Sequence, residues 1–253
     1  MTGKIGGRRT LVLGGGTGIG LACARALSAN GARVFLSGRR EAPLVTAAAS
    51  LSPAEVGYAT GDATDEEDVK RVVAEALEFL GTLDTVVVSA GACGVTGVVD
   101  TTLAEFSRIV NGNLFPMFLA IRHTAPHLMQ SQRGSFIAIS SMYGLVGQPE
   151  RTAYSAAKGG MNGMIRSIAL ALADKGVRAN AICPGFIETD LSMEMISRED
   201  DPQAVLKARR RMHPIPRAGT TDDIGAMAAF LASDGAAWIT GQAFLVDGGY
   251  TAR

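Results

Sequence analysis

The chain has 253 residues and a formal net charge of zero, because 24 Lys and Arg balance 24 Asp and Glu. Binding to nucleic acid or to an anionic membrane surface needs a basic face, so a neutral chain argues against both partners. Hydrophobic residues make up 47% of the chain, enough for a large core without disulfide bonds. No stretch of about 18 apolar residues exists, so no membrane span is expected.

Three cysteines, Cys23, Cys93 and Cys183, are odd in number and far apart in the chain. They form no disulfide framework and no metal-binding pair, which indicates a reducing, cytoplasmic environment. His123 and His127 lie four residues apart on an expected helix, but no carboxylate stands between them and Pro126 does. We therefore expect no metal site.

Short apolar runs alternate with longer helical patterns along the whole chain. The expected strands span residues 10–13, 33–37, 56–60, 85–89, 135–140, 177–182 and 243–246. The expected helices span residues 19–30, 66–80, 103–130, 153–173 and 222–232. Such alternation predicts an α/β fold with one doubly wound (Rossmann-type), mostly parallel sheet of seven strands and helices on both faces.

We expect a single domain over residues 1–253, since no linker or repeat interrupts the pattern. The one long departure is the Met- and charge-rich segment 192–215. We interpret the region from about 190 to 215 as a flexible insertion beside the carboxyl ends of the strands, where such folds bind ligands. The run Arg209-Arg210-Arg211 is interpreted as a solvated face. Met193, Met195 and Met212 either line a substrate pocket or pack on the surface.

A glycine-rich loop joins the first strand to the first helix, over residues 14–20. Gly14, Gly18 and Gly20 allow a tight turn, close approach of the backbone to a pyrophosphate and packing of the helix on the sheet. The alternative is a glycine turn that binds no ligand. The cofactor-binding residues expected in the loop are Gly14, Gly16, Thr17, Gly18, Ile19 and Gly20.

The end of the second strand reads Ser37-Gly38-Arg39-Arg40, with no carboxylate to accept from a ribose 2′-hydroxyl. Arg39 would stabilise a 2′-phosphate through charge-assisted hydrogen bonds, so NADP(H) is preferred, and NAD(H) remains possible. The alternative is a solvated arginine pair that begins a helix.

Tyr154 and Lys158 are spaced i and i+4 on an expected helix, so they share one face. A neighbouring ammonium favours phenolate, which would bring the pKa of Tyr154 toward neutrality for proton transfer. Ser140 and Ser141 end the preceding strand, and one of the two would place a hydroxyl opposite the phenol.

The glycine loop, the Ser141…Tyr154-x-x-x-Lys158 set and the chain length together resemble the short-chain dehydrogenase/reductase family, in particular its 3-oxoacyl-acyl carrier protein reductases. The resemblance covers essentially the whole chain. It implies that Tyr154 is the acid/base and that Lys158 lowers its pKa and binds the nicotinamide ribose. It also implies that Ser141 orients the substrate oxygen and that Asn113 holds a water in a proton relay.

Further cofactor contacts follow from the same resemblance. Asp62 and Ala63 would lie beside the adenine, and the stretch from Pro184 to Thr189 would lie against the nicotinamide amide. The additional cofactor-binding residues implied are Ser89, Ala90, Gly91, Tyr154, Lys158, Pro184, Gly185, Ile187 and Thr189. The family usually shows Asn-Asn-Ala-Gly after the fourth strand, whereas this chain reads Val88-Ser89-Ala90-Gly91. Because Val88 cannot make the bonds of an Asn side chain, altered cofactor affinity is expected.

These observations lead us to expect an NADP(H)-dependent oxidoreductase that interconverts a carbonyl and a secondary alcohol of a small molecule. The alternatives are a non-catalytic dinucleotide-binding sensor or scaffold, or an NAD-dependent alcohol dehydrogenase of the same fold. Ala156, Gly160, Gly163 and Ser167 form a stripe of small residues on an apolar helix, and the resemblance implies that this helix packs in a homotetramer.

Overall fold

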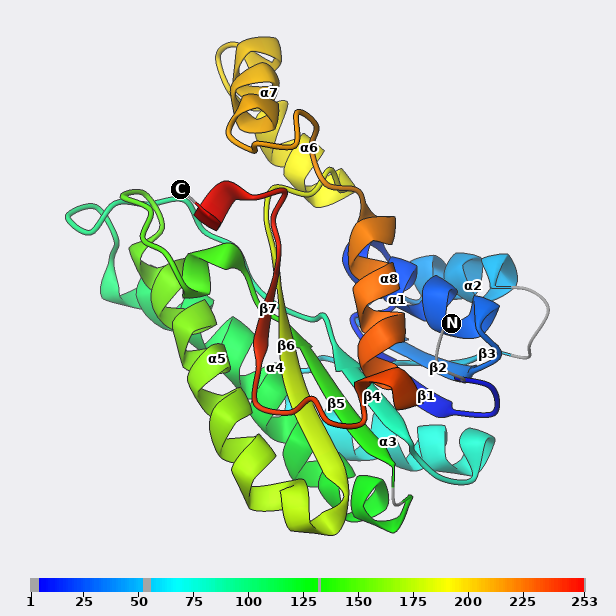
Figure 1. The fold of residues 1–253 in the computed structure, drawn as a ribbon. Coiled ribbons are helices and arrows are strands. Elements are labelled where there is room, and N and C mark those ends of the chain that lie inside the picture. The colour runs from blue at the N-terminus through cyan, green and yellow to red at the C-terminus, as the bar shows by residue number, and fades with distance from the viewer. Residues whose placement is uncertain (1–4, 52–55, 132, 253) are drawn as a thin grey trace.

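Seven parallel strands form one sheet in the order β3-β2-β1-β4-β5-β6-β7 (Figure 1). The computed structural model describes residues 5–51, 56–131 and 133–252, so the ends of the expected domain, 1–4 and 253, lie outside it. The strands are β1 (Arg9–Leu13), β2 (Arg33–Gly38), β3 (Val56–Thr60), β4 (Thr85–Val88), β5 (Gly134–Ile139), β6 (Val177–Pro184) and β7 (Ala243–Val246). Every pairing of neighbouring strands is parallel, which confirms the expected doubly wound sheet.

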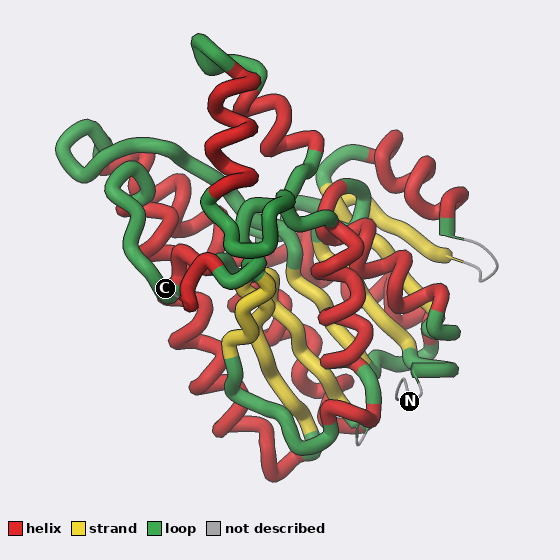
Figure 2. Tube along the Cα trace, turned by 45° about the horizontal axis from the view of Figure 1, so that its top comes forward, coloured by secondary structure: helices red, strands yellow, loops and turns green. Residues whose placement is uncertain are grey.

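Helices cover both faces of this sheet (Figure 2). On one face lie α1 (Gly18–Ala29), α2 (Glu41–Ser50) and α8 (Thr221–Ala232). On the other lie α3 (Glu66–Leu80), α4 (Leu103–Gln130) and α5 (Thr152–Leu172). Consecutive apolar residues in β4 show why both faces need covering: Val87 packs under α1 and α8, whereas Val86 and Val88 pack under the opposite helices.

Val88 is fully buried in this core. An Asn amide at the same position would have to find hydrogen-bond partners among apolar side chains. In this chain Val88 is therefore a packing residue. The backbone of Ala90, two residues further on, makes the close approach to the glycine turn described below.

Helix α2 is present although the sequence pattern predicts no helix there. Pro43 lies in its first turn, where a proline is tolerated, and only Leu44 and Ala47 are buried. This narrow apolar contact explains why periodicity does not reveal the helix. Arg40 is its N-cap residue, so one part of the arginine pair does begin a helix.

The segment expected as an insertion contains two short helices, α6 (Asp190–Ile196) and α7 (Pro202–Arg211). Thr189 and Ser192 cap α6 reciprocally, and Asp201 accepts from Ala204 N–H at 2.9 Å at the start of α7. The two helices project beyond the edge of the sheet (Figures 1 and 2). Among the helices in the described parts of the chain, none combines the length and hydropathy of a membrane span.

Candidate active site

The glycine turn after β1 packs directly against the backbone that follows β4. Gly14 has a φ of 82°, and a Cβ there would lie 2.6 Å from the Ala90 nitrogen. A Cβ on Gly20 would overlap the carbonyl oxygen of Gly14. Side chains are therefore excluded from both positions, and the start of α1 lies close to the central strands.

A long cavity of about 1070 Å³ runs along the carboxyl ends of β1 to β4. Gly20 does not line it but supports the turn from behind. The expected cofactor residues that line it are Gly14, Gly16, Thr17, Gly18, Ile19, Arg39, Asp62, Ala63, Ser89, Ala90, Gly91 and Thr189. The cavity is thus bordered by backbone and small residues at the glycine turn and by a cation at the end of β2.

At that far end, Arg39 is exposed and makes no ion pair within the described ranges. Asp62 on the next loop is already engaged, because its Oδ1 accepts from the Thr64 N–H at 2.9 Å and from the Thr64 hydroxyl at 2.7 Å. These two hydrogen bonds hold the pKa of Asp62 below its usual range. The cations available to a phosphate here are Arg39 and its neighbour Arg40, which also lines the cavity, is exposed and has no ion pair among the described residues.

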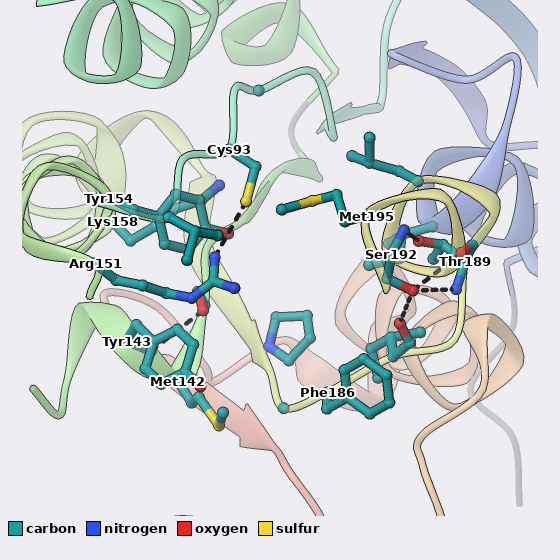
Figure 3. A pocket seen from close by; sticks show the side chains of 18 of the residues that line it. Cys93, Met142, Tyr143, Arg151, Tyr154, Lys158, Phe186, Thr189, Ser192 and Met195 are labelled. Carbon is teal, nitrogen blue, oxygen red and sulfur yellow. Dashed lines mark hydrogen bonds between the residues drawn. The ribbon is translucent and has the colours of Figure 1, made fainter. Parts of the chain in front are cut away.

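An inner cavity of about 300 Å³ continues from the long one (Figure 3). The two cavities share eight lining residues, among them the expected Ile19, Ser89, Gly91 and Thr189. The other expected site residues that line the inner cavity are Asn113, Ser141, Tyr154, Lys158, Pro184, Gly185 and Ile187. All the expected catalytic residues therefore lie together, at the end of the longer cavity.

Ser140 and Ser141 take different roles in the structure. Ser140 Oγ donates to the Lys158 carbonyl at 3.2 Å and fastens α5 to the end of β5. Ser141 caps the short turn that follows, where its Oγ accepts from the Tyr143 N–H at 3.2 Å, and it also hydrogen-bonds Tyr154. Ser141 is thus the serine whose hydroxyl meets the phenol.

Lys158 is buried, and its Nζ donates to the Ile139 carbonyl at 2.9 Å. Burial lowers the pKa of this ammonium to about 8, because the charged form loses its hydration. The Nζ lies 5.5 Å from the centre of the Tyr154 ring.

The pKa of Tyr154 differs from the sequence expectation, since burial raises it well above its usual value. The hydrogen bond to Ser141 and the Arg151 guanidinium lower it, but by less than burial raises it. The Lys158 ammonium is turned toward Ile139 O rather than acting on the phenol. In this structure the phenol is therefore protonated near neutral pH.

Asn113 is fully buried in α4, and its Nδ2 donates to the carbonyls of Ile109 and Ala92 at 2.7 and 2.8 Å. Its Oδ1 has no hydrogen-bond partner among the described residues. A Cβ on Gly91 would lie 2.7 Å from this oxygen and 3.6 Å from Lys158 Nζ. The Asn113 oxygen, an acceptor, and the Lys158 ammonium thus lie on either side of the space beside Gly91. Any side chain larger than that of glycine at position 91 would fill this space.

The sequence did not reveal several residues of the inner cavity. Among them are Cys93 and Arg151. Tyr143, Phe186 and Arg209 also line this cavity, and they fall in the segments 142–150, 184–189 and 192–215 in which the sequence predicts contacts with substrate or cofactor. Arg209 corrects the expectation of a solvated run: it lines the cavity, while its neighbour Arg210 pairs with Glu188 at 2.7 Å. Arg151 could have been found from its position directly before the helix that carries Tyr154.

The two histidines on α4 take no part in either cavity. His123 Nε2 lies 2.9 Å from Glu66 Oε1, on the face that α3 covers. Within the described parts of the chain, no three potential metal ligands cluster together.

Comparison with known proteins agrees with this geometry. A family model described as "Enoyl-(Acyl carrier protein) reductase" matches residues 14–251. The chain belongs to the short-chain dehydrogenase/reductase family. A "Glucose 1-dehydrogenase" of Gluconobacter oxydans (strain 621H) is 35% identical over 98% of this chain and 93% of that protein. An "NADP-dependent (R)-specific alcohol dehydrogenase" of Lentilactobacillus kefiri is 35% identical over the full length of both chains.

Among solved structures, one titled "Crystal Structure of Levodione Reductase" superposes with a TM-score of 0.94 at 30% identity, covering 98% of both chains. Members of this family use NAD(P)(H) and act on CH–OH groups, so the protein is a dehydrogenase/reductase that interconverts alcohols and carbonyls. The long cavity fits such a cofactor, because its glycine cradle would be filled by any Cβ at Gly14.

The low pKa of Lys158 makes stability depend on pH in a defined window. Between pH 8 and 10.5 the folded protein has released this proton while the unfolded chain still holds it, so the free energy of unfolding rises with pH. The free energy of unfolding of the wild type, relative to that of Lys158→Met, should therefore rise by about 3 kcal/mol across this pH window and should not change below pH 8. Urea unfolding at several pH values measures the difference. Lys175→Met, an exposed control, should show no such window, and a flat Lys158→Met difference would contradict the assignment.

Proposed function

We propose that the protein is an NADP(H)-dependent oxidoreductase that interconverts a carbonyl and a secondary alcohol, with Tyr154 as its acid/base. The observation that supports this most is the meeting of Ser141, Tyr154 and Lys158 where the two cavities join. A substrate in the inner cavity would contact the phenol on one side and the cofactor on the other.

When bound, the cofactor supplies or accepts the hydride. In the reductive direction Tyr154 donates its proton to the oxygen of the substrate as negative charge develops there. Ser141 would stabilise the same oxygen, because its Oγ accepts from Tyr143 N–H and its O–H, which here hydrogen-bonds Tyr154, could turn to the substrate. The oxidative direction uses the same groups in reverse.

Lys158 and Asn113 complete the proposed machinery. Lys158 donates to Ile139 O and, at 3.6 Å, to the weak acceptor Met161 Sδ, and its third N–H would bind a ribose hydroxyl of the cofactor. Asn113 Oδ1 would accept from a water between it and the ammonium, which would return protons to Tyr154 through Lys158. Pro184, Gly185, Ile187 and Thr189 would hold the nicotinamide end, and Asp62 and Ala63 the adenine end.

Replacing Tyr154 by Phe tests the acid/base assignment. The variant should lose about a hundred- to ten-thousand-fold in kcat, the usual contribution of a positioned proton donor. Its Kd for NADPH, measured by fluorescence titration, should change little, and Tyr58→Phe on β3 should keep full activity. If Tyr154→Phe keeps wild-type turnover with saturating cofactor, the assignment is wrong. Cofactor binding by the wild type without turnover of any carbonyl compound would favour a sensor.

The preference for NADP(H) is proposed from Arg39, which with Arg40 places exposed cations at the end of the long cavity. Exchanging it for Asp replaces attraction to a 2′-phosphate by repulsion, so Arg39→Asp should weaken NADPH binding by at least about ten-fold and favour NADH. Lys175→Asp makes the same charge change far from the cavity and should alter neither Kd. Tighter binding of NADH than NADPH by the wild type would reject the preference and leave an NAD-dependent alcohol dehydrogenase.

We further propose a cytoplasmic homotetramer. The outer faces of α4 and α5 expose Phe118 and Leu170, the latter at 84% of its surface, next to the stripe of small residues on α5. Exposed apolar side chains of this size mark a contact surface. Light scattering at micromolar concentration should give the mass of four chains, and a monomeric mass would contradict the assembly. The three free cysteines suit a reducing compartment.

A further inference from the structure

We infer that Arg151 is a substrate-binding residue, which recognises an anionic group on a short oxo or hydroxy compound. The inference rests on the proposed function, since it places the anion beside the carbon that is reduced or oxidised. A carboxylate is the simplest such group, and a guanidinium binds it through paired hydrogen bonds.

Arg151 stands directly before α5, and its side chain lies in the inner cavity beside Tyr154 (Figure 3). Its Cζ is 5.8 Å from the centre of the Tyr154 ring and 5.5 Å from that of Tyr143. Its Nη1 donates to Cys93 Sγ at 3.2 Å and to the Gly94 carbonyl at 3.4 Å. The guanidinium is therefore held in position next to the reacting phenol.

None of these neighbours neutralises its charge. Aromatic faces attract a cation without taking up its N–H donors, and a thiol is a weak acceptor. The Nε and Nη2 donors have no acceptor within the part of the chain that the structure describes. By contrast, Arg217 forms two hydrogen bonds with the Asp223 carboxylate, and Arg108 two with that of Glu105. Arg151 thus retains both donors and charge for a ligand.

The remaining charged groups of the inner cavity are consistent with this assignment. Arg209 of α7 adds a second cation, and none of the ion pairs described for the chain includes it. Glu150 and Glu199 also line the cavity, but both side chains are exposed and neither pairs with Arg151. The ammonium of Lys158 is engaged by Ile139 O. The charge available deep in the cavity, next to Tyr154, is therefore that of Arg151.

The dimensions limit the size of the compound. The cavity holds about 300 Å³, and the guanidinium and the phenol ring are neighbours. An anion bound at Arg151 would therefore be separated from the reacting carbonyl by only a few bonds. The substrate class assigned here is a small oxo acid, or the matching hydroxy acid in the oxidative direction.

Pairs of compounds that differ only in charge test the inference. With NADPH, kcat/KM is measured for pyruvate, acetoacetate and levulinate and for their methyl esters, with wild type, Arg151→Gln and Arg151→Lys. The wild type should prefer at least one acid over its ester by about ten-fold or more. Arg151→Gln should lower kcat/KM for that acid by about ten- to one-hundred-fold, mainly through KM, and leave its ester unchanged. Arg151→Lys should recover part of the loss.

Two controls separate this role from others. Arg211→Gln removes an exposed arginine at the end of α7 and should leave both acid and ester unchanged. The Arg151 guanidinium also lowers the pKa of Tyr154, so in Arg151→Gln the alkaline limb of the kcat profile should move upward equally for acid and ester. Near neutral pH the phenol stays protonated in both proteins, so there only the acid should lose kcat/KM. Equal turnover of acids and esters by the wild type, or an equal loss on both in Arg151→Gln, would overturn the inference and leave the proposed function intact.

If none of these compounds is turned over, that result counts against the proposed function itself. A binding measurement can then still test whether Arg151 recognises an anion. Calorimetric titration of the NADPH-loaded protein with each acid then decides. Binding by the wild type that Arg151→Gln weakens about ten-fold or more would support anion recognition by Arg151. Absence of binding, or equal binding by both proteins, would refute it.

Discussion

Two hydrogen bonds of Lys158 join α5 to the end of β5, and the positions of the reactive groups depend on them. Its Nζ donates to the Ile139 carbonyl, while its own carbonyl accepts from Ser140. Tyr154 lies one helical turn earlier, so the same clamp sets the phenol next to Ser141. Burying the Lys158 ammonium is unfavourable, as its lowered pKa shows. The site therefore lowers the free energy of unfolding, and the packing of the rest of the core compensates for this loss.

Much of the fold could be predicted because its signals are local. Strands buried on both faces read as continuous apolar runs, as Val86-Val87-Val88 does, and glycines mark the turn after β1. The loops that follow parallel strands meet at one edge, so residues from distant parts of the chain could be grouped before their contacts were known. Helix α2 could not be predicted because it buries few apolar side chains. In addition, Pro43 in the sequence indicates the end of a helix rather than part of its first turn.

The electrostatics could not be predicted in the same way. Spacing alone puts a lysine near a tyrosine, but the pKa of the phenol depends on how deeply it is buried and on where the ammonium points. Both are results of tertiary packing. Arg151 and Cys93 meet only because the loop after β4 passes over the start of α5, as the bridge between Thr96 and Arg151 shows. No local pattern contains that contact.

The two walls of the inner cavity are attached to the protein to very different extents. One wall, β5 with α5, belongs to the main core. The other, α6 and α7, buries only Ile196 and Leu206 and is joined to the loop after β6 by the solvent-exposed pair of Arg210 with Glu188. Exposed ion pairs contribute little to stability. The shape of this wall can therefore be altered by substitutions in α6 and α7 without unfolding the sheet or displacing Ser141, Tyr154 and Lys158.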